Sequence, residues 1–142
     1  MKQVAKLVII DSDNKYLMMY RSVHPVFGND ADLPGGTLED GEQPLETMIR
    51  EVYEEAGIKI VESAVQNVYE GNDYSAHGTH YSLFIAHLAN RPVVNMSWEH
   101  SAYEWLDGND FLEKAKNAKD TYMHMVYDQL SYSSADDDTV NS

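Results

Sequence analysis

The chain has 142 residues, a length typical of one compact domain, and 43% of them are hydrophobic, as in an ordinary globular protein. Its 24 acidic residues outnumber 10 basic ones, and the formal net charge of -14 disfavours binding to nucleic-acid polymers or anionic membranes. The absence of cysteine excludes disulfides, thiolate catalysis and Cys-based metal sites. No segment approaches the roughly 20 apolar residues that span a bilayer, so we expect a soluble, cytoplasmic protein.

The first part of the chain predicts a β-hairpin followed by a loop. Two largely apolar runs, the first interrupted by Lys6, flank a polar turn. A segment with Pro, Gly and Asn then predicts a loop, which leads to a short extended piece and a glycine turn. In chain order these segments are 4–10, 11–15, 16–21, 22–32 and 33–36.

The rest of the chain predicts helices and strands in alternation. We expect a helix over 43–56, a strand over 58–69, a polar loop over 71–78 and a second strand over 79–88. An irregular segment over 89–97, a short strand over 101–106 and a helical region over 111–130, with a break near Asn117, follow. Residues 131–142 are polar and acidic, which predicts a disordered tail. The mixture predicts one α/β domain over 1–130.

Three glutamates meet on one face of the helix predicted over 43–56. At about 100° per residue, Glu51, Glu54 and Glu55 are neighbours, on a different arc from the apolar stripe. Arg50, the one nearby cation, projects to the side of the cluster. A hard divalent cation such as Mg²⁺ would neutralise these carboxylates, because it prefers oxygen ligands. From the helix alone, a solvated acidic face is an equally good interpretation, since Glu is a good helix former.

The segment around this helix resembles the signature of the Nudix hydrolases. That signature is Gly, five residues, Glu, seven residues, Arg-Glu, an aliphatic residue, any residue, Glu-Glu, any residue, Gly and an aliphatic residue. All its positions are filled here, by Gly36, Glu42, Arg50, Glu51, Val52, Glu54, Glu55, Gly57 and Ile58. Thr47 and Ala31 depart from residues common in the family, and neither is a presumed ligand. The resemblance implies an α/β/α sandwich around a mixed β-sheet.

The resemblance also implies roles for individual residues. The carbonyl of Gly36 and the carboxylates of Glu51, Glu54 and Glu55 would bind Mg²⁺, with Mn²⁺ as a substitute. One glutamate, such as Glu51, would orient or deprotonate the attacking water. Arg50 would hold a glutamate in place through a salt bridge.

Several candidates lie outside the signature. Family members often take one more acidic ligand from a later segment, and Glu104 fits that position better than its competitor Glu99. Arg21 is suited to binding a substrate phosphate, although a surface ion pair is an equally good interpretation. Tyr74 lies at a distance from Gly57 where some dinucleoside-polyphosphate hydrolases of this family carry a base-stacking Tyr.

The predicted activity is hydrolysis of the diphosphate linkage in a nucleoside diphosphate linked to another group X. Depending on the group X, the substrate would be a nucleoside triphosphate, a nucleotide sugar or a dinucleoside polyphosphate. The alternative is a non-catalytic nucleotide sensor on the same fold. Substrate choice would depend on the loops 22–32, 71–78 and 89–100. The expected partner is a small nucleotide-like molecule, and the sequence leaves monomer and homodimer open.

Overall fold

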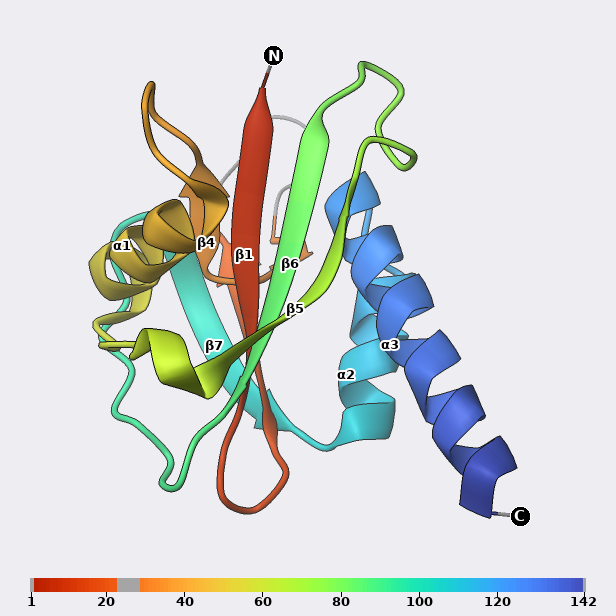
Figure 1. Ribbon diagram of the computed structural model, residues 1–142. Coiled ribbons are helices and arrows are strands. Elements are labelled where there is room, and N and C mark those ends of the chain that lie inside the picture. The colour runs from red at the N-terminus through yellow and green to blue at the C-terminus, as the bar shows by residue number, and fades with distance from the viewer. Residues whose placement is uncertain (1, 23–28, 142) are drawn as a thin grey trace.

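The computed structural model describes residues 2–22 and 29–141, and for 132–141 it describes the backbone alone. Within these residues a mixed sheet of seven strands lies between helix α1 on one face and helices α2 and α3 on the other (Figure 1). The strands are β1 (Gln3–Ile10), β2 (Tyr16–Arg21), β3 (Ala31–Asp32), β4 (Gly35–Thr37), β5 (Val65–Gly71), β6 (His80–His87) and β7 (His100–Leu106). The helices are α1 (Pro44–Ala56), α2 (Gly108–Lys116) and α3 (Thr121–Asn141), with a 3-10 turn at Glu62–Ala64. The predicted α/β/α sandwich is confirmed.

Strand β1 lies at the centre of the sheet and changes its neighbour along its length. It runs parallel to β6, which makes the sheet mixed. On its other side, Ile10 pairs with Tyr16 of β2 at one end, whereas residues 4–6 pair with β4 at the other. The main strand order is β3-β2-β1-β6-β5, and β7 pairs with β2. Two strands from different parts of the chain therefore share one edge of β1.

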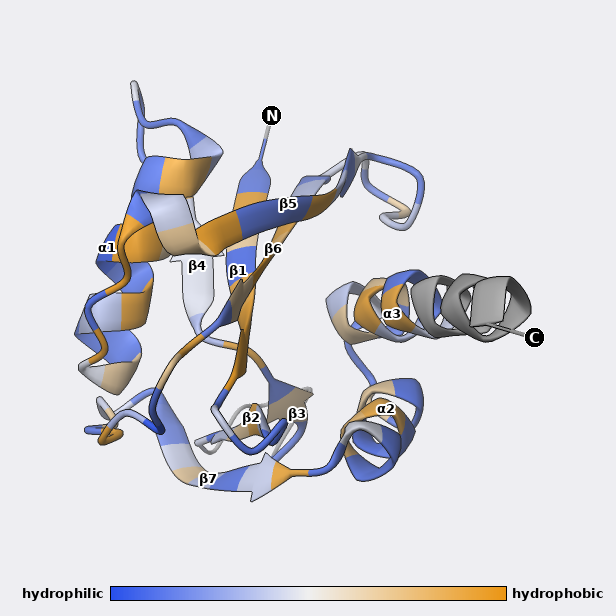
Figure 2. Cartoon of the chain, turned by 60° about the horizontal axis from the view of Figure 1, so that its bottom comes forward, coloured by the Kyte–Doolittle hydropathy of each residue, from blue (hydrophilic) through white to orange (hydrophobic). Residues whose placement is uncertain are grey.

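Alternate residues of β1 serve two separate cores. Leu7 and Ile9 pack in the cluster that contains Met48 and Val52 of α1. Val8 packs in the cluster formed with α2 and α3, which includes Phe111 and Met123. Figure 2 shows the apolar residues concentrated in the sheet and on the helix surfaces beside it. This two-sided burial explains why the first predicted strand is an almost continuous apolar run.

The boundaries of α1 follow the sequence signals closely. Pro44 lies in the first turn, where its missing N–H removes no helical hydrogen bond. Gly57 ends the helix in the left-handed conformation with φ 70°, and its N–H donates to the carbonyl of Tyr53.

The strand predicted over 58–69 is wrong in its first half. Ile58 and Ile60 are buried against the α1 core, which explains the apolar pattern. Their backbone, however, pairs with no strand in the described part of the chain, and β5 begins only at Val65 after the 3-10 turn. A buried side chain at every second position does not by itself make a strand.

The C-terminal region is broken near Asn117, as predicted. Asn117 caps the end of α2, and the carboxylate of Asp30 accepts hydrogen bonds from the N–H groups of Lys119 and Asp120 before α3 begins. The backbone of α3 continues to Asn141, which differs from the disordered tail predicted for 131–142; the tail's side chains lie outside the described residues. No helix within the described ranges has the length and apolar content needed to span a membrane.

We predict that Gly35→Ala destabilises the fold by about 3 kcal/mol or more in urea denaturation. A Cβ at Gly35 would lie 2.3 Å from the carbonyl oxygen of Ala5, and φ is +141°. Gly41→Ala is the matched control, because Gly41 also has a positive φ, +85°, but has open space around it. Its expected cost is about 1 kcal/mol, from backbone strain alone. Equal losses for the two variants would contradict the steric argument.

Candidate metal and substrate site

A cavity of about 760 Å³ opens where β1, β4 and the end of α1 meet the start of α3. Three glutamates line it, together with three cations and two aspartates. These charged residues are Glu51, Glu55, Glu99, Lys2, Lys6, Arg21, Asp32 and Asp120. Hydroxyl groups of Ser75, Thr79 and Thr121, and His77, complete much of the polar lining.

Glu55 is the most buried of the three signature glutamates, with 5% of its surface exposed. Its carboxyl accepts a hydrogen bond of 2.9 Å from the N–H of Gly35 and shares another with the carboxyl of Glu99. Burial, followed by the hydrogen bond to Glu99, raises the pKa of Glu55 to about 9. Two facing carboxyls of this kind share a proton at neutral pH, and a divalent cation is the chemical alternative to that proton.

The segment that carries Glu99 is attached to the end of α1. The N–H of Asn95 donates to the carbonyl of Ala56, at 2.8 Å, and the N–H of Ser97 donates to the carbonyl of Glu55, at 3.0 Å. The same stretch therefore contacts Glu55 through both its backbone and its side chain.

Glu51 lies against Gly36 of β4, the short strand that pairs with β1. A Cβ on Gly36 would lie 2.8 Å from the carboxyl carbon of Glu51, so only glycine allows this approach. Burial is the main cause that raises the pKa of Glu51 above its usual value, and the charge of Arg50 opposes it. The backbone of Gly36 and the carboxylate of Glu51 therefore lie at the same side of the cavity.

Arg50 organises the acidic face of α1. Its guanidinium makes two hydrogen bonds of 2.9 Å to Glu42, one of 2.9 Å to Glu51 and a longer contact of 3.2 Å to Glu54. The hydrogen bonds from Arg50 are the main cause that lowers the pKa of Glu42 to about 2. The hydroxyl of Thr47 also donates to Glu42, at 2.9 Å, which gives this departure from the residue common in the family a structural role.

The arrangement fits a divalent cation in its chemistry. Across the described residues, no three His, Cys, Asp or Glu side chains are already grouped as a metal site. Arg50 contacts both Glu51 and Glu54, and the Glu54 side chain is 54% exposed and does not line the cavity. Glu51, Glu55 and Glu99 nevertheless line one cavity and offer only oxygen ligands, which Mg²⁺ and Mn²⁺ prefer.

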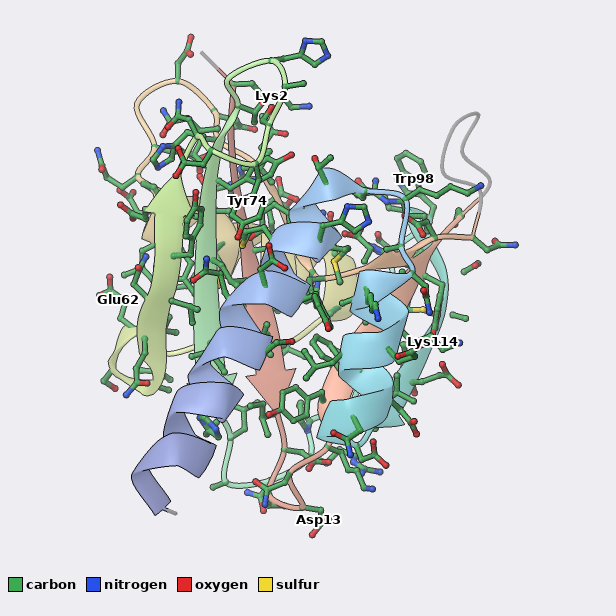
Figure 3. The ribbon with its side chains drawn as sticks, turned by 90° about the vertical axis from the view of Figure 1, so that its right-hand side faces the viewer. Lys2, Asp13, Glu62, Tyr74, Trp98 and Lys114 are labelled. Carbon is green, nitrogen blue, oxygen red and sulfur yellow. The ribbon has the colours of Figure 1, made fainter. Side chains whose placement is uncertain are left out.

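The structure does not bring Glu104 and Tyr74 to this cavity. Glu104 pairs with Met18 across β7 and β2 and accepts a 2.5 Å hydrogen bond from the hydroxyl of Tyr20. Tyr74, labelled in Figure 3, lies on the side of the molecule that carries α3. Its ring packs edge-on against Tyr69, and its hydroxyl donates to Asp128 of α3, at 3.0 Å. Both side chains are thus held by partners elsewhere. Glu99, the competitor of Glu104, is the one that lines the cavity.

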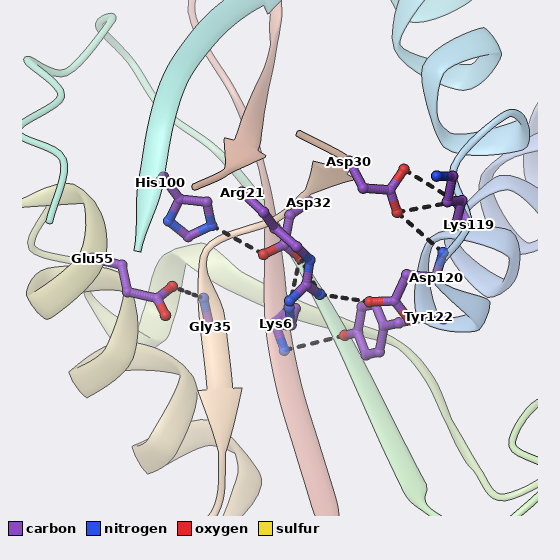
Figure 4. A network of polar contacts seen from close by, with 10 residues as sticks. All are labelled: Lys6, Arg21, Asp30, Asp32, Gly35, Glu55, His100, Lys119, Asp120 and Tyr122. Atoms are coloured by element: carbon purple, nitrogen blue, oxygen red, sulfur yellow. Dashed lines mark hydrogen bonds and ion pairs between the residues drawn. The ribbon is translucent and has the colours of Figure 1, made fainter. Parts of the chain in front are cut away.

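A charged network that the motif did not predict lies beside the glutamates (Figure 4). Arg21 lines the cavity as expected, but its guanidinium contacts Asp120 at 2.6 Å and Asp32 at 3.5 Å. Asp32 also accepts from Lys6, at 2.6 Å, and contacts Nε2 of His100, at 3.0 Å. The sequence signals for this network were Lys6, a charge inside an apolar strand, and Arg21, for which an ion pair was one of the two interpretations.

A family model described as the NUDIX domain matches residues 1–126. The chain belongs to the Nudix family. The match covers every residue of the acidic face of α1 and all of the charged network beside it. The Nudix signature at residues 36–58 begins in β4, beside β1, and continues through α1.

Comparison with known proteins identifies relatives with different substrates. An ADP-ribose pyrophosphatase of Methanocaldococcus jannaschii is 39% identical over 70 residues, 49% of this chain and 41% of that protein. An 8-oxo-dGTP diphosphatase of Proteus vulgaris is 36% identical over 59 residues, 42% of this chain and 53% of that protein. The matches thus span about half of these relatives' length or less.

The fold is also found in a solved structure of a larger protein. A bifunctional NMN adenylyltransferase/ADP-ribose pyrophosphatase from Francisella tularensis, complexed with AMP and a manganese ion, has a TM-score of 0.65 at 22% identity. The similarity covers 87% of this chain and 39% of that one. At this level of identity the comparison shows a common fold.

We predict that the chelated protein loses stability as pH rises from about 5 to about 9, in part because of Glu55. Its pKa is about 9 in the fold against 4.5 as the ordinary value, so between these values the unfolded chain releases a proton that the folded protein keeps. Its contribution is fully present below pH 4.5 and is lost as pH rises to about 9. Glu55→Gln should flatten the dependence of Tm on pH in EDTA.

Glu62→Gln is the control for this experiment, because Glu62 is exposed and lies outside the cavity. It removes the same formal charge. If Glu55→Gln and Glu62→Gln change the dependence of Tm on pH equally, the inference that Glu55 is protonated in the folded protein is wrong.

Proposed function

We propose that this Nudix protein hydrolyses the diphosphate linkage of a nucleoside diphosphate linked to a group X, with Mg²⁺ as its cofactor and Mn²⁺ as a substitute. The observation that carries the proposal is the complete signature on α1, with Glu51 and Glu55 lining the same cavity as Glu99. The two relatives are named for cleavage of different nucleoside diphosphate compounds, which supports the reaction class and leaves X open.

In the proposed reaction, the carbonyl of Gly36 and the carboxylates of Glu51, Glu54 and Glu55 would hold the divalent cation. Bound there, it would supply positive charge to the phosphate oxygens and lower the pKa of water. Water attacks one phosphorus, the P–O bond of the anhydride breaks, and the leaving phosphate keeps the electron pair. Glu51 accepts the proton that this water loses, a task helped by its raised pKa.

Arg50 is a positioning residue in this scheme. Its strongest contacts are the paired hydrogen bonds to Glu42, which hold the guanidinium against the segment that precedes α1. From that position it contacts both Glu51 and Glu54. Arg50 thus holds the carboxylates of Glu51 and Glu54 in position, and the scheme gives it no contact with the substrate.

The cavity supports a small partner with phosphate groups. Its lining from the 71–78 loop, Ser75 and His77, together with Arg21, offers hydrogen-bond donors to a polar ligand. The net charge of -14 opposes a polyanionic polymer, whereas a cation-bound diphosphate is screened locally. The role proposed for Tyr74 in base stacking lacks support, since that side chain contacts α3. Residues 23–28 of the first specificity loop lie outside the described residues.

We predict that wild-type protein with Mg²⁺ releases phosphate or pyrophosphate from at least one compound in a substrate screen. The screen covers nucleoside triphosphates, damaged nucleotides, nucleotide sugars and dinucleoside polyphosphates. Glu54→Gln should lower kcat by about 100-fold, because it removes a carboxylate that stabilises charge in the transition state. Glu46→Gln is the matched control, an exposed glutamate in the first turn of the same helix. Near-wild-type turnover by Glu54→Gln would reject the site, and binding without turnover across the screen would favour the sensor.

We further propose that Glu99, in place of Glu104, supplies the additional acidic ligand. Glu99 lines the cavity and hydrogen-bonds to Glu55, whereas Glu104 is bonded to Tyr20 outside it. Glu99→Gln should weaken Mn²⁺ binding at least about tenfold in calorimetry without substrate. Glu104→Gln should leave Mn²⁺ affinity unchanged, and the reverse ranking would restore Glu104 as the ligand.

A further inference from the structure

Lys6 is a charged side chain buried inside the central strand of the sheet. It lies in β1 between the apolar residues Val4 and Val8, is 7% exposed, and lines the cavity. Its ammonium donates a hydrogen bond of 2.6 Å to Asp32 (Figure 4). A buried lysine is costly unless its charge and its hydrogen-bond donors are satisfied. The contacts of this ammonium therefore need a full account.

The donors of Lys6 exceed its acceptors. An ammonium has three N–H groups, and Asp32 accepts from one of them. The ring of Tyr122 lies 5.5 Å from Nζ and faces the cation on one side. Among the described residues, Nζ makes no hydrogen bond or ion pair other than that to Asp32. At least one N–H of a side chain that is more than nine-tenths buried is thus available to a ligand in the cavity.

Asp32 does not need Lys6 alone to balance its charge. Arg21 and His100 also contact this carboxylate, at 3.5 Å and 3.0 Å. Burial raises the pKa of Asp32, but the charge of Lys6 and the hydrogen bond from His100 more than offset this and keep it well below its usual range. Asp32 is therefore an ionised anchor that fixes the direction of the Lys6 ammonium.

Lys6 lines the same cavity as the signature residues Glu51 and Glu55. Lys6 pairs with Gly35 across β1 and β4, and a Cβ on Gly35 would lie 2.6 Å from Cγ of Lys6. The N–H of the same Gly35 donates to Glu55. A cation and a carboxylate that both contact Gly35 therefore line one cavity.

We propose that Lys6 is a substrate-contacting residue, whose ammonium, aimed by Asp32, donates to a non-bridging phosphate oxygen of the bound diphosphate. The inference rests on the proposed function, because it places the diphosphate in this cavity. A phosphate oxygen suits the site, since it is an anionic acceptor and never a donor. The competing role is purely structural, in which Lys6 only neutralises Asp32.

The two roles are separated by measuring the effect of Lys6→Met in two backgrounds. The probe is inorganic pyrophosphate with Mg²⁺, and its affinity is measured by calorimetry, which requires no turnover. In the wild-type background Lys6→Met should weaken pyrophosphate binding by about 10-fold to 100-fold, the size expected for one charge-assisted hydrogen bond. Lys59→Met, an exposed lysine outside the cavity, should leave the affinity unchanged.

The second background is Asp32→Asn, which removes the Asp32 charge that Lys6 neutralises but keeps an amide oxygen that can accept the hydrogen bond of the ammonium. If Lys6 contacts phosphate, Lys6→Met still weakens pyrophosphate binding about 10-fold or more in this background. A loss that appears in the wild-type background and vanishes in the Asp32→Asn background overturns the inference, as does an unchanged affinity of Lys6→Met in the wild-type background. Thermal unfolding of each variant identifies any that has not folded. If Lys6→Met alone does not fold, the comparison of Asp32→Asn with the double variant Asp32→Asn, Lys6→Met still tests the inference.

Failure of this inference is distinguishable from failure of the proposed function. Turnover by the wild type with unaltered pyrophosphate affinity in Lys6→Met retains the hydrolase and rejects the lysine contact. Pyrophosphate binding that depends on Lys6, without turnover of any compound, retains the contact and rejects hydrolysis. A wild type that does not bind pyrophosphate overturns the contact.

Discussion

The close approach of β4 to β1 is the constraint on which the site depends. Gly35 and Gly36 pair with Lys6 and Ala5, at a separation that leaves no room for a Cβ at Gly35. This approach turns the N–H of Gly35 toward Glu55 and brings the backbone of Gly36 against Glu51. The acidic face of α1 is therefore positioned from the sheet and not by the helix alone.

The two faces of β1 have different roles near the site, since one packs against α1 and the other carries the charged side chain of Lys6. Ala5 and Leu7 fill the core beneath α1, which fixes the height of that helix over the sheet. Lys6, between them, lies on the opposite face beside Tyr122 and Asp32. A single strand thus supports the helix that carries the glutamates and supplies a cation on the other side. The alternation of a β-strand makes both possible within three residues.

The sequence predicted α1 and its acidic face well because these depend on local spacing. Helical periodicity, Pro44 at the start and Gly57 at the end are all signals within one segment. The Lys6–Asp32 pair was missed because its partners are 26 residues apart and meet only through sheet pairing. Glu104 was preferred to Glu99 for a related reason, since sheet pairing and Tyr20 hold Glu104 outside the cavity. Neither distinction is visible in spacing along one chain.

The attachment of residues 95–97 to the end of α1 also has a mechanical consequence. Asn95 and Ser97 bind the carbonyls of Ala56 and Glu55, so the segment leading to Glu99 takes its position from the same helical turn that carries Glu55. The two carboxyls are therefore connected through a few residues and two backbone hydrogen bonds instead of through the whole sheet. We expect a displacement of the sheet or of a distant loop to move both carboxyls together and to leave the distance between them unchanged.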